Sequence, residues 1–334
     1  MTVRFGLLGA GRIGRVHAKA ISGDANARLV AVADAFPDAA LAIGAQYGCD
    51  IRSIDAILAA TDIDAVVICT PTDTHADLIE AFARAGKAIF CEKPIDLSLP
   101  RVKSCLQVVR DTGAVLMVGF NRRFDPHFVA VRAAIDAGTI GAVEMVTITS
   151  RDPGAPPVDY IARSGGIFRD MTVHDFDMAR FLLGEEITEV SAMAAVLTDP
   201  AIGLAGDFDS VQVMLKTATG KQAMISNSRR AAYGYDQRIE VHGSLGAVTA
   251  ENQRPVMIEV ATAAGYTRPP LHDFFMTRYT EAYAAEIAAF IAVLGGAGVA
   301  SPSGIDGMAA LALAEAALKS VTERRMVTVA EVMA

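Results

Sequence analysis

The sequence predicts an α/β fold in its first third and an α+β fold in the remainder. Apolar runs alternate with amphipathic helical segments over residues 3–120, a pattern typical of a doubly wound parallel sheet. After residue 120 the apolar residues recur with a period of two, which predicts a large, predominantly antiparallel open sheet. The length of 334 residues is enough for two domains that each bury a core.

The composition argues against several classes of partner. Hydrophobic residues make up 52% of the chain, so a disordered protein is excluded. The net charge of −8 and the pI near 5.3 argue against nucleic acid and membrane surfaces, because both call for a concentrated basic surface. No apolar run reaches membrane-spanning length, and the short apolar N-terminus leads straight into a glycine loop, which favours a strand over a signal peptide. The four cysteines lack CxxC spacing and are expected as buried free thiols in a cytoplasmic protein.

A glycine loop follows the first expected strand, residues 3–8. The segment Gly9-Ala10-Gly11-Arg12-Ile13-Gly14 lies between that strand and a helix ending near Ser22, the setting in which G-x-G-x-x-G binds a dinucleotide. We expect Gly9 to form the tight turn, Gly11 to let a pyrophosphate approach the backbone, and Gly14 to let the helix pack on the strand. The free N–H groups of the helix then face the phosphates. A coincidental glycine turn is the alternative.

An acidic residue ends the second expected strand, residues 28–33. Asp34 lies at about the distance past the loop, roughly 20 residues, at which a carboxylate binds both ribose hydroxyls. That carboxylate would repel a 2′-phosphate. Because Ala35 follows and no arginine lies nearby to hold the phosphate, NAD is expected in preference to NADP.

The alternation of helices and strands continues to residue 120. It predicts helices at 37–47, 53–60, 74–85 and 98–111, and strands at 64–70, 88–93 and 114–120. Two polar turns follow these strands, and ligands of doubly wound sheets lie at such strand ends. The first turn, Thr70 to His75, contains Pro71 and Thr74 and can surround a ribose or a nicotinamide edge.

The second turn is Glu92-Lys93-Pro94. A lysine directly after a buried strand is unusual, because lysine is seldom placed against apolar surface without a partner or a function. A cationic nicotinamide nearby would disfavour the ammonium and make its proton easier to move. Lys93 could equally donate a fixed hydrogen bond to a substrate hydroxyl, or point to solvent.

The second half combines strands with one inserted helix. Strands are expected within 143–152, 189–198, 210–220, 221–230 and 237–246, with a hairpin turn at Thr219-Gly220. Helices are expected at 126–137, 165–184, 274–293 and 305–322, with a short strand at 326–330. The exposed face of such a sheet needs cover, and a partner subunit is a good candidate. The chain therefore divides into 1–120 for the dinucleotide, 121–300 for substrate and oligomer contacts, and 301–334, whose helix we expect to pack on the first domain.

The inserted segment, residues 165–184, carries the most chemistry. Asp170, His174 and Asp177 are spaced i, i+4 and i+7, which places them on one narrow helical face. An imidazole beside a carboxylate suits general acid/base work. The alternative is a solvated polar face, and metal ligation is disfavoured because a catalytic zinc site usually has more His or Cys ligands. A separate apolar stripe should face the core: Val173, Phe176, Ala179 and Leu183.

Four segments together resemble the Gfo/Idh/MocA oxidoreductases, and within them the inositol dehydrogenase branch. They are the GAGRIG loop, the EKP tripeptide, the run GGIFRDMTVHDFDMARFLLGEE and the run NSRRAAYGYDQRIEVHGSLG. The resemblance covers essentially the whole chain. It implies NAD-dependent oxidation of a secondary ring hydroxyl of a cyclic polyol, with myo-inositol going to 2-keto-myo-inositol (scyllo-inosose). The open C-terminal sheet separately suggests a homotetramer or dimer built through that sheet.

The resemblance also implies roles for single residues. Lys93, Asp170 and His174 would form the catalytic group without a metal, whereas Asp177 receives no catalytic role. Arg123, Asp152, Tyr233 and Tyr235 would lie around the polyol, together with the catalytic group. Contacts to the cofactor would come from the loops at the strand ends: Gly9, Gly11, Arg12, Ile13, Gly14, Asp34, Thr70, Pro71, Thr74, His75, Glu92 and Lys93.

Two alternatives remain at this point. One is a pyranose dehydrogenase of the same family that uses the same Lys93 and His174, because the sequence between Leu271 and Phe275 contains no tryptophan and does not specify stereochemistry. The other is a non-catalytic NAD-binding regulator, which is disfavoured because both Lys93 and His174 are present.

Overall fold

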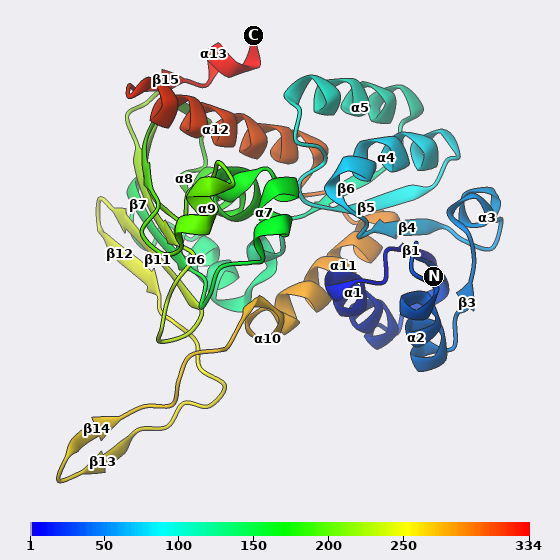
Figure 1. Cartoon of the computed structure of the whole chain (residues 1–334), viewed down its shortest axis with the longest axis horizontal. Helices are drawn as coiled ribbons and strands as arrows, with labels where there is room; N and C mark the ends of the chain where they lie inside the picture. The colour runs from blue at the N-terminus through cyan, green and yellow to red at the C-terminus, as the bar shows by residue number, and fades with distance from the viewer. Residues whose placement is uncertain (1) are drawn as a thin grey trace. The chain divides into compact units, whose positions relative to one another are not determined.

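The structure is a computed structural model that describes residues 2–334 (Figure 1). The chain forms two compact units, Met1–Asp125 with Thr280–Leu311, and Pro126–Tyr279 with Ala312–Ala334. The first unit therefore includes a late segment, Thr280–Leu311, in addition to the N-terminal residues. The three-part division expected from the sequence stays a prediction.

The first unit contains a six-stranded parallel sheet with the order β3-β2-β1-β4-β5-β6. This order is that of a dinucleotide-binding Rossmann fold, so the predicted doubly wound sheet is confirmed. The shortest strand, β3, was not predicted, because two residues are too few to show a period. The strands are β1 Val3–Leu8, β2 Ala27–Ala33, β3 Asp50–Ile51, β4 Ala65–Ile68, β5 Ala88–Glu92 and β6 Leu116–Gly119.

Capping residues mark several of the ends of the helices in the first unit. The side chains of Ser53 and Ser98 accept hydrogen bonds from the first turns of α3 and α5. Gly48 and Gly113 end α2 and α5 in the left-handed conformation. The elements are α1 Arg12–Gly23, α2 Pro37–Tyr47, α3 Ile54–Ala59, α4 His75–Arg84, α5 Leu99–Thr112 and α11 Thr280–Leu294, with 3-10 turns η1 Thr72–Thr74 and η2 Asn121–Phe124.

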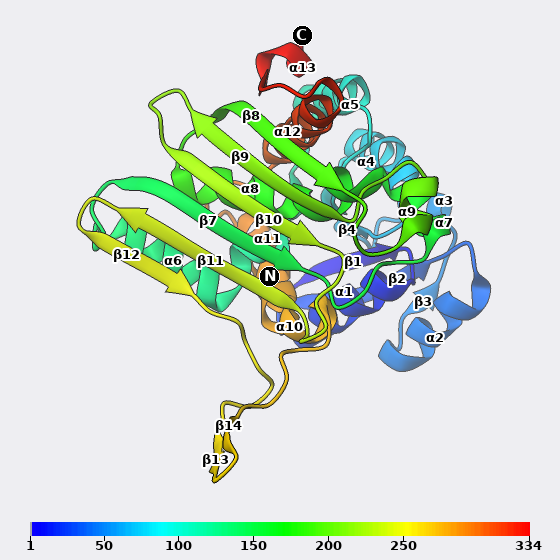
Figure 2. The ribbon, with the colours of Figure 1, turned by 60° about the vertical axis from the view of Figure 1, so that its left-hand side comes forward.

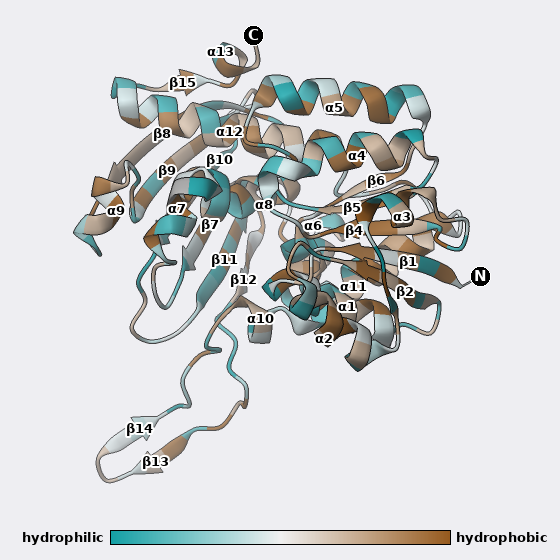
Figure 3. Ribbon diagram, turned by 45° about the vertical axis from the view of Figure 1, so that its right-hand side comes forward, coloured by the Kyte–Doolittle hydropathy of each residue, from teal (hydrophilic) through white to brown (hydrophobic). Residues whose placement is uncertain are grey.

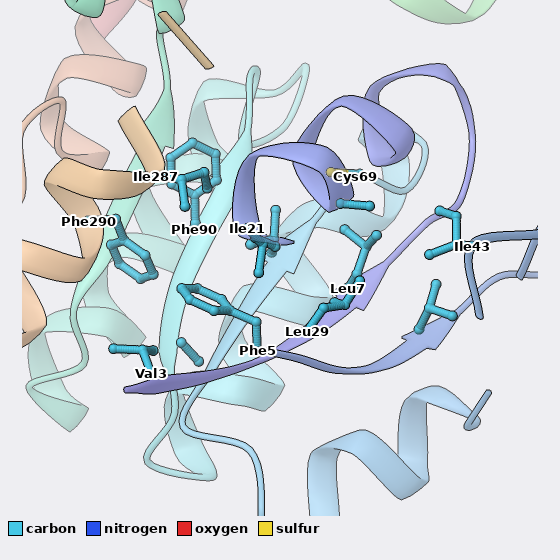
Figure 4. Close-up of a cluster of buried hydrophobic side chains, with 14 of the residues drawn as sticks. Val3, Phe5, Leu7, Ile21, Leu29, Ile43, Cys69, Phe90, Ile287 and Phe290 are labelled. Carbon is cyan, nitrogen blue, oxygen red and sulfur yellow. The ribbon is translucent and has the colours of Figure 1, made fainter. Parts of the chain in front are cut away.

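The core of the first unit joins segments that are far apart in the sequence. Phe5 of β1 and Phe90 of β5 contact Phe290 of α11, with ring centroids 6.2 and 5.8 Å apart (Figure 4). The strands of this sheet are largely hydrophobic, as Figure 3 shows for β1 and β4. Each fully buried phenylalanine stabilises the fold by about 1.5–3 kcal/mol. Helix α11 is thus part of the first unit's core.

The second unit contains a seven-stranded sheet with the order β12-β11-β7-β10-β9-β8-β15 (Figure 2). Only β7 and β10 pair in parallel, so the prediction of a predominantly antiparallel sheet is confirmed. The predicted hairpin joins β9 to β10, and Gly220 has a φ of +95° in its turn. The strands are β7 Val143–Arg151, β8 Ile187–Ala195, β9 Ser210–Thr217, β10 Gln222–Ser228, β11 Asp236–Gly243, β12 Gly246–Ala250 and β15 Val327–Thr328.

In the second half of the chain, two helices of the structure differ from those expected from the sequence. The segment expected as one helix at 274–293 forms two, α10 and α11, with Tyr279 between them. The segment expected at 165–184 begins as a π-helix, η3 Phe168–Thr172, and continues as α8. The remaining helices are α6 Pro126–Asp136, α7 Val158–Ser164, α8 Val173–Leu183, α9 Pro200–Leu204, α10 Phe275–Arg278, α12 Gly304–Glu323 and α13 Ala330–Met333.

A hairpin arm, residues 254–270, projects from the sheet of the second unit (Figures 1 and 2). Its strands are β13 Val260–Thr262 and β14 Gly265–Thr267, and every residue of both is exposed. The sequence analysis did not predict this arm. Within residues 2–334, no helix has the length and apolarity that a bilayer crossing requires. The four cysteines are free thiols as expected, three of them buried.

Candidate active site

The glycine loop of the first unit has the geometry expected of a pyrophosphate site. Gly9 has a φ of +98°, and a Cβ on it would lie 2.5 Å from the Cys69 carbonyl oxygen. A Cβ on Gly14 would lie 2.0 Å from the Gly9 carbonyl oxygen, so only glycine lets α1 approach this turn. At Gly11 a Cβ would meet nothing within 4 Å, which leaves the backbone open to a ligand. These residues fit the pyrophosphate of NAD, and their contacts to it, with those of Arg12 and Ile13, stay predictions.

The Asp34 carboxylate lies at the end of β2 against the same loop. Its Oδ2 accepts a hydrogen bond from the Ala10 backbone N–H at 2.5 Å, and its Oδ1 accepts one from the Phe36 N–H at 2.7 Å. These two bonds fix the carboxylate at the loop, and each oxygen has a second lone pair for a ribose hydroxyl. The position fits the predicted role in NAD recognition.

The turn after β4 is held together by its own side chains. Thr70 Oγ1 and Thr74 Oγ1 are 2.6 Å apart, and the Thr74 hydroxyl donates to the Pro71 carbonyl oxygen at 2.8 Å. His75 is buried, with Nε2 2.7 Å from the Thr70 carbonyl oxygen. Its Nδ1 lies 2.8 Å from the carbonyl oxygen of Pro94 in the next turn. Both ring nitrogens of His75 therefore bind the protein, and contacts of this turn to a cofactor stay predictions.

Lys93 follows β5 directly and is partly exposed. Its backbone N–H donates to Glu92 Oε2 at 3.3 Å. Glu92 itself is buried, and its Oε1 lies 2.7 Å from His17 Nε2 inside the unit. The Glu92 carboxylate thus binds interior groups, and the expected contact of Glu92 with the cofactor stays a prediction.

Arg123 has a structural partner within the first unit. Its Nη2 lies 2.9 Å from Asp306 Oδ1, and only 9% of the Arg123 side chain is exposed. Burial raises the pKa of Asp306, but the charge of Arg123 and hydrogen bonds from Ser303 outweigh it and lower that pKa to about 2. The pair joins η2 to the start of α12. A contact of Arg123 with a polyol stays a prediction.

In the second unit, Asp170 lies in the π-helical turn η3. Gly166, with a φ of +82°, begins this segment, and a Cβ there would lie 2.6 Å from Asp207 Oδ1. The same oxygen accepts a hydrogen bond from the Ile167 N–H at 3.0 Å. Asp207 therefore packs on and hydrogen-bonds the backbone directly before the π-turn. Such turns often occur at functional sites.

Two residues that the sequence analysis did not select hold the Asp170 carboxylate. The Tyr160 hydroxyl donates to Asp170 Oδ1 at 2.9 Å. Arg229, whose side chain is 1% exposed, has both terminal nitrogens 3.5 Å from Asp170 Oδ2. A buried arginine requires a charged partner, so the Arg-Arg pair at 229–230 was an available clue. Together these contacts set the orientation of Asp170.

Helix α8 is anchored to the sheet by a residue next to His174. Asp175 accepts hydrogen bonds from Ser150 Oγ of β7 at 2.6 Å and from Asn227 Nδ2 of β10 at 2.8 Å. His174 is partly exposed, in contrast to Asp177, which is fully buried. The prediction that Asp177 shares an outward face with Asp170 and His174 is therefore wrong. His174 and Asp177 both lie within α8, where most residues are buried, and three positions along this helix take the side chain from the partly exposed face into the core.

The other predicted polyol residues lie in the second unit. The Tyr233 hydroxyl accepts a hydrogen bond from Arg151 Nη1 at 3.0 Å and donates to Asp236 Oδ2 at 2.6 Å. Tyr235 is buried, and its ring packs edge-on against Phe274 and Tyr279. Asp152 continues the β7 backbone, with its N–H donating to the Ser228 carbonyl oxygen. Their contacts to a substrate stay predictions.

Comparison with protein families matches both parts of the chain. Residues 3–120 match the model of an oxidoreductase family with an NAD-binding Rossmann fold. Residues 128–249 match the model of the GFO/IDH/MocA C-terminal domain. The two matches together cover more than two thirds of the chain.

Individual relatives match over nearly the full length. The chain is 77% identical to an inositol 2-dehydrogenase of Rhizobium meliloti, over 99% of this chain and 100% of that protein. The structure of a myo-inositol dehydrogenase from Corynebacterium glutamicum is 44% identical, with a TM-score of 0.94 over 98% of this chain and 99% of that one. The structure of scyllo-inositol dehydrogenase from Lactobacillus casei with bound NAD(H) and scyllo-inositol is 28% identical, with a TM-score of 0.91 over 99% of this chain and 100% of that one.

Proposed function

The chain belongs to the Gfo/Idh/MocA family of NAD-binding oxidoreductases, and we propose on this premise that it oxidises one secondary hydroxyl of an inositol to a ketone. The observation that carries the proposal is full-length similarity to inositol 2-dehydrogenases, and Lys93, Asp170 and His174 are the residues of this chain to which we assign the chemistry. NAD supplies the acceptor for the hydride, at C4 of its nicotinamide ring. For myo-inositol the product is 2-keto-myo-inositol (scyllo-inosose).

Three side chains carry the proposed proton chemistry. His174 accepts the proton of the reacting hydroxyl as the carbon-bound hydrogen leaves. Asp170 orients the imidazole and offsets its developing charge, and Tyr160 and Arg229 support this role because they hold the carboxylate. Lys93 donates a hydrogen bond to the same oxygen and stabilises its developing negative charge. This assignment requires no metal ion.

The remaining hydroxyls of the ring need a polar surface. We assign Asp152, Arg123, Tyr233 and Tyr235 to this surface, and Tyr233 is the one with the most exposed side chain. Its hydroxyl already joins Arg151 to Asp236, so a polyol hydroxyl would extend an existing network.

The test of this assignment is the His174→Ala variant. We expect kcat to fall by about two to four orders of magnitude, the range typical of a positioned acid/base group. NAD+ affinity should change little, because the glycine loop and Asp34 are untouched. NADH formation gives kcat, and calorimetric titration gives the affinity. The matched control is His242→Ala, a half-exposed histidine on β11. Near-normal turnover of His174→Ala would refute the role of His174.

The substrate is tested separately with a panel of cyclic polyols and sugars. Myo-, scyllo- and chiro-inositol should be oxidised with higher kcat/KM than glucose or galactose. A preference for glucose or galactose would support the pyranose dehydrogenase instead. NAD+ binding without turnover on any of them would support the regulator.

The open sheet supports a further part of the proposal, a homotetramer or dimer. Four methionines lie on alternating, outward positions of β7, β8, β9 and β10, with 42% to 73% of each exposed. They are Met145, Met193, Met214 and Met224. Flexible methionines suit an interface, and a second copy would cover this face.

We place the enzyme in the cytoplasm and in inositol catabolism.

A further inference from the structure

The tripeptide Glu92-Lys93-Pro94 has a buried histidine on each side. His17 of α1 is bound to the residue before Lys93, and His75 at the start of α4 is bound to the residue after it. The two histidines are 0% and 2% exposed. Neither histidine was selected for such a role from the sequence, and both belong to the first unit.

On the first side, the Glu92 carboxylate has little freedom to move. Oε1 lies 2.7 Å from His17 Nε2, and Oε2 accepts the Lys93 backbone N–H at 3.3 Å. A Cβ on Gly119 of the neighbouring strand would lie 3.1 Å from the Glu92 carboxyl carbon, so this carboxylate packs directly on the β6 backbone. The His17 ring is itself held edge-on by Phe90 and Tyr283, with centroids 5.2 and 5.6 Å away.

A third buried group, Glu286 of α11, completes this cluster. Its Oε1 lies 4.0 Å from His17 Nε2, and neither of its carboxyl oxygens has a hydrogen-bond partner among residues 2–334. Burial, and then the charge of Glu92, raises the pKa of Glu286 well above its ordinary value. Burial thus favours the uncharged form of the Glu286 carboxyl group.

The three side chains are close enough for a metal ion to be considered, since their ligand atoms lie within 4.8 Å of one another. The 2.7 Å between His17 Nε2 and Glu92 Oε1 argues against it. Two ligands of a tetrahedral zinc ion lie about 3.3 Å apart, because each bond is about 2.0–2.1 Å long. A distance of 2.7 Å is that of a hydrogen bond, so a proton joins these atoms.

On the second side, His75 binds two carbonyl oxygens. Nδ1 lies 2.8 Å from the Pro94 oxygen, and Nε2 lies 2.7 Å from the Thr70 oxygen. His75 thereby ties the turn after β5 to the turn after β4.

We propose that His17 and His75 are positioning residues for Lys93, His17 through the Glu92 carboxylate and His75 through the Pro94 carbonyl. The inference rests on the catalytic role proposed above for Lys93. Because Glu92 and Pro94 are both held, the backbone of Lys93 between them has a fixed position. That position determines where the Lys93 side chain can place its amine. A displacement of about 1 Å at a reacting group can lower a rate by about 100-fold, so loss of either anchor should slow the reaction.

The test uses the fact that asparagine and glutamine each replace one histidine nitrogen. The amide nitrogen of asparagine takes the place of Nδ1, and that of glutamine takes the place of Nε2. His17 anchors Glu92 through Nε2, so His17→Gln should retain a kcat about tenfold or more above that of His17→Asn. His75 anchors Pro94 through Nδ1, so the order reverses, and His75→Asn should exceed His75→Gln by a similar factor.

This crossed order separates positioning from general damage. A histidine needed only for folding would lose activity with both amides alike, with circular dichroism reporting the loss of structure. Equal kcat for Asn and Gln at both positions would overturn the proposal. His17→Asn and His75→Gln are the two variants that lose the anchor. Their KM for NAD+ should change less than about threefold, because the glycine loop is intact. A change confined to KM would also overturn the proposal.

The Lys93→Met variant tests the premise independently. If Lys93→Met turns over normally, the proposed function of Lys93 fails. If Lys93→Met is inactive but the crossed order is absent, only the positioning proposal fails.

Elemental analysis of the purified protein tests whether a metal ion binds at His17, Glu92 and Glu286 instead. One bound metal per chain that is lost in Glu286→Gln would overturn the hydrogen-bonded assignment of His17, and absence of metal is the expected result.

Discussion

At the scale of a single residue, we expect the Asp34 carboxylate to set the choice between NAD and NADP. Replacing Asp34 with alanine removes the predicted acceptor for the ribose hydroxyls and also removes the carboxylate that the Ala10 and Phe36 N–H groups bind. Hydrogen bonds to a charged group contribute about 1.5–3 kcal/mol, so we expect the KM for NAD+ to rise by about 10- to 100-fold. The ratio of kcat/KM for NADP+ to that for NAD+ should rise as well, because a negative charge is removed.

The control for this variant is Asp38→Ala, an exposed acidic residue in the first turn of α2. It retains the carboxylate at β2 and should leave the ratio unchanged. Steady-state kinetics with both nucleotides provide the measurement. An unchanged ratio in Asp34→Ala would mean that another group excludes the 2′-phosphate.

A second prediction at this scale compares two glycines of the same helix. A Cβ on Gly14 would lie 2.0 Å from the Gly9 carbonyl oxygen, whereas a Cβ on Gly23 would meet nothing within 4 Å. Gly14→Ala must therefore displace the glycine loop, and we expect it to lower the free energy of unfolding by about 1–3 kcal/mol and to weaken NAD+ binding. Gly23→Ala should be neutral or stabilising by up to about 1 kcal/mol, because alanine restricts the unfolded chain.

Urea denaturation and NAD+ titration of both variants check this comparison. Normal NAD+ affinity in Gly14→Ala would show that α1 can move away from β1 without cost to the site. The tight turn at Gly9 and the close helix packing at Gly14 could be predicted from the sequence, because the G-x-G-x-x-G spacing fixes both turn and helix locally. The pairing of His17 with Glu286 could not, because no local pattern joins residues so far apart in the chain.

At the scale of elements, periodicity located nearly all helices and strands of the parallel sheet, because fully buried strands form continuous apolar runs. It could not show that α11 returns to the first unit, because an apolar helix face does not specify the sheet that it covers. It also missed the π-turn before α8. The backbone just before that turn binds Asp207, which is 40 positions away in the sequence, so no local pattern marks the turn.

The junction of η2 with α12 provides a prediction on pH. The pKa of Asp306 is about 2 in the folded chain, against an ordinary value of 3.8, because the charge of Arg123 and the hydrogen bonds from Ser303 and Arg123 together outweigh the effect of burial. The folded pKa is the lower one, so ionised Asp306 stabilises the fold above about pH 4, and this contribution is lost as the pH falls towards 2. Its size is on the order of 2 kcal/mol.

The Asp306→Asn variant tests this contribution. Its free energy of unfolding should be lower than that of the parent by about 2 kcal/mol at neutral pH, and the difference should shrink as the pH approaches 2. Urea denaturation followed by circular dichroism at several pH values gives both quantities. Asp111→Asn, an exposed position on α5, is the control. A difference that does not vary with pH would assign the loss to packing and not to the charge on Asp306.

At the scale of the whole molecule, the exposed apolar residues of the second unit predict assembly. The methionine face of the sheet is one such surface, and the arm is another. In the arm, Met257 and Tyr266 are more than 70% exposed. An isolated two-stranded hairpin is marginally stable in water, so contact with another copy would stabilise it. Proteins commonly cover such surfaces by forming closed symmetric oligomers, with about 800 Å² buried on each partner.

Met224→Glu tests whether the sheet face forms that contact. Met224 lies directly opposite Met214 on the neighbouring strand, so a glutamate there places a charge among the exposed methionines. In a twofold interface the same charge would appear from both copies, and burying it without a partner costs several kcal/mol. Light scattering should show an oligomer for the parent and smaller species for Met224→Glu. Leu204→Glu, on the exposed helix α9, should retain the parental mass. A parent that is monomeric, or a Met224→Glu variant with the parental mass, would place the subunit contact elsewhere or remove it.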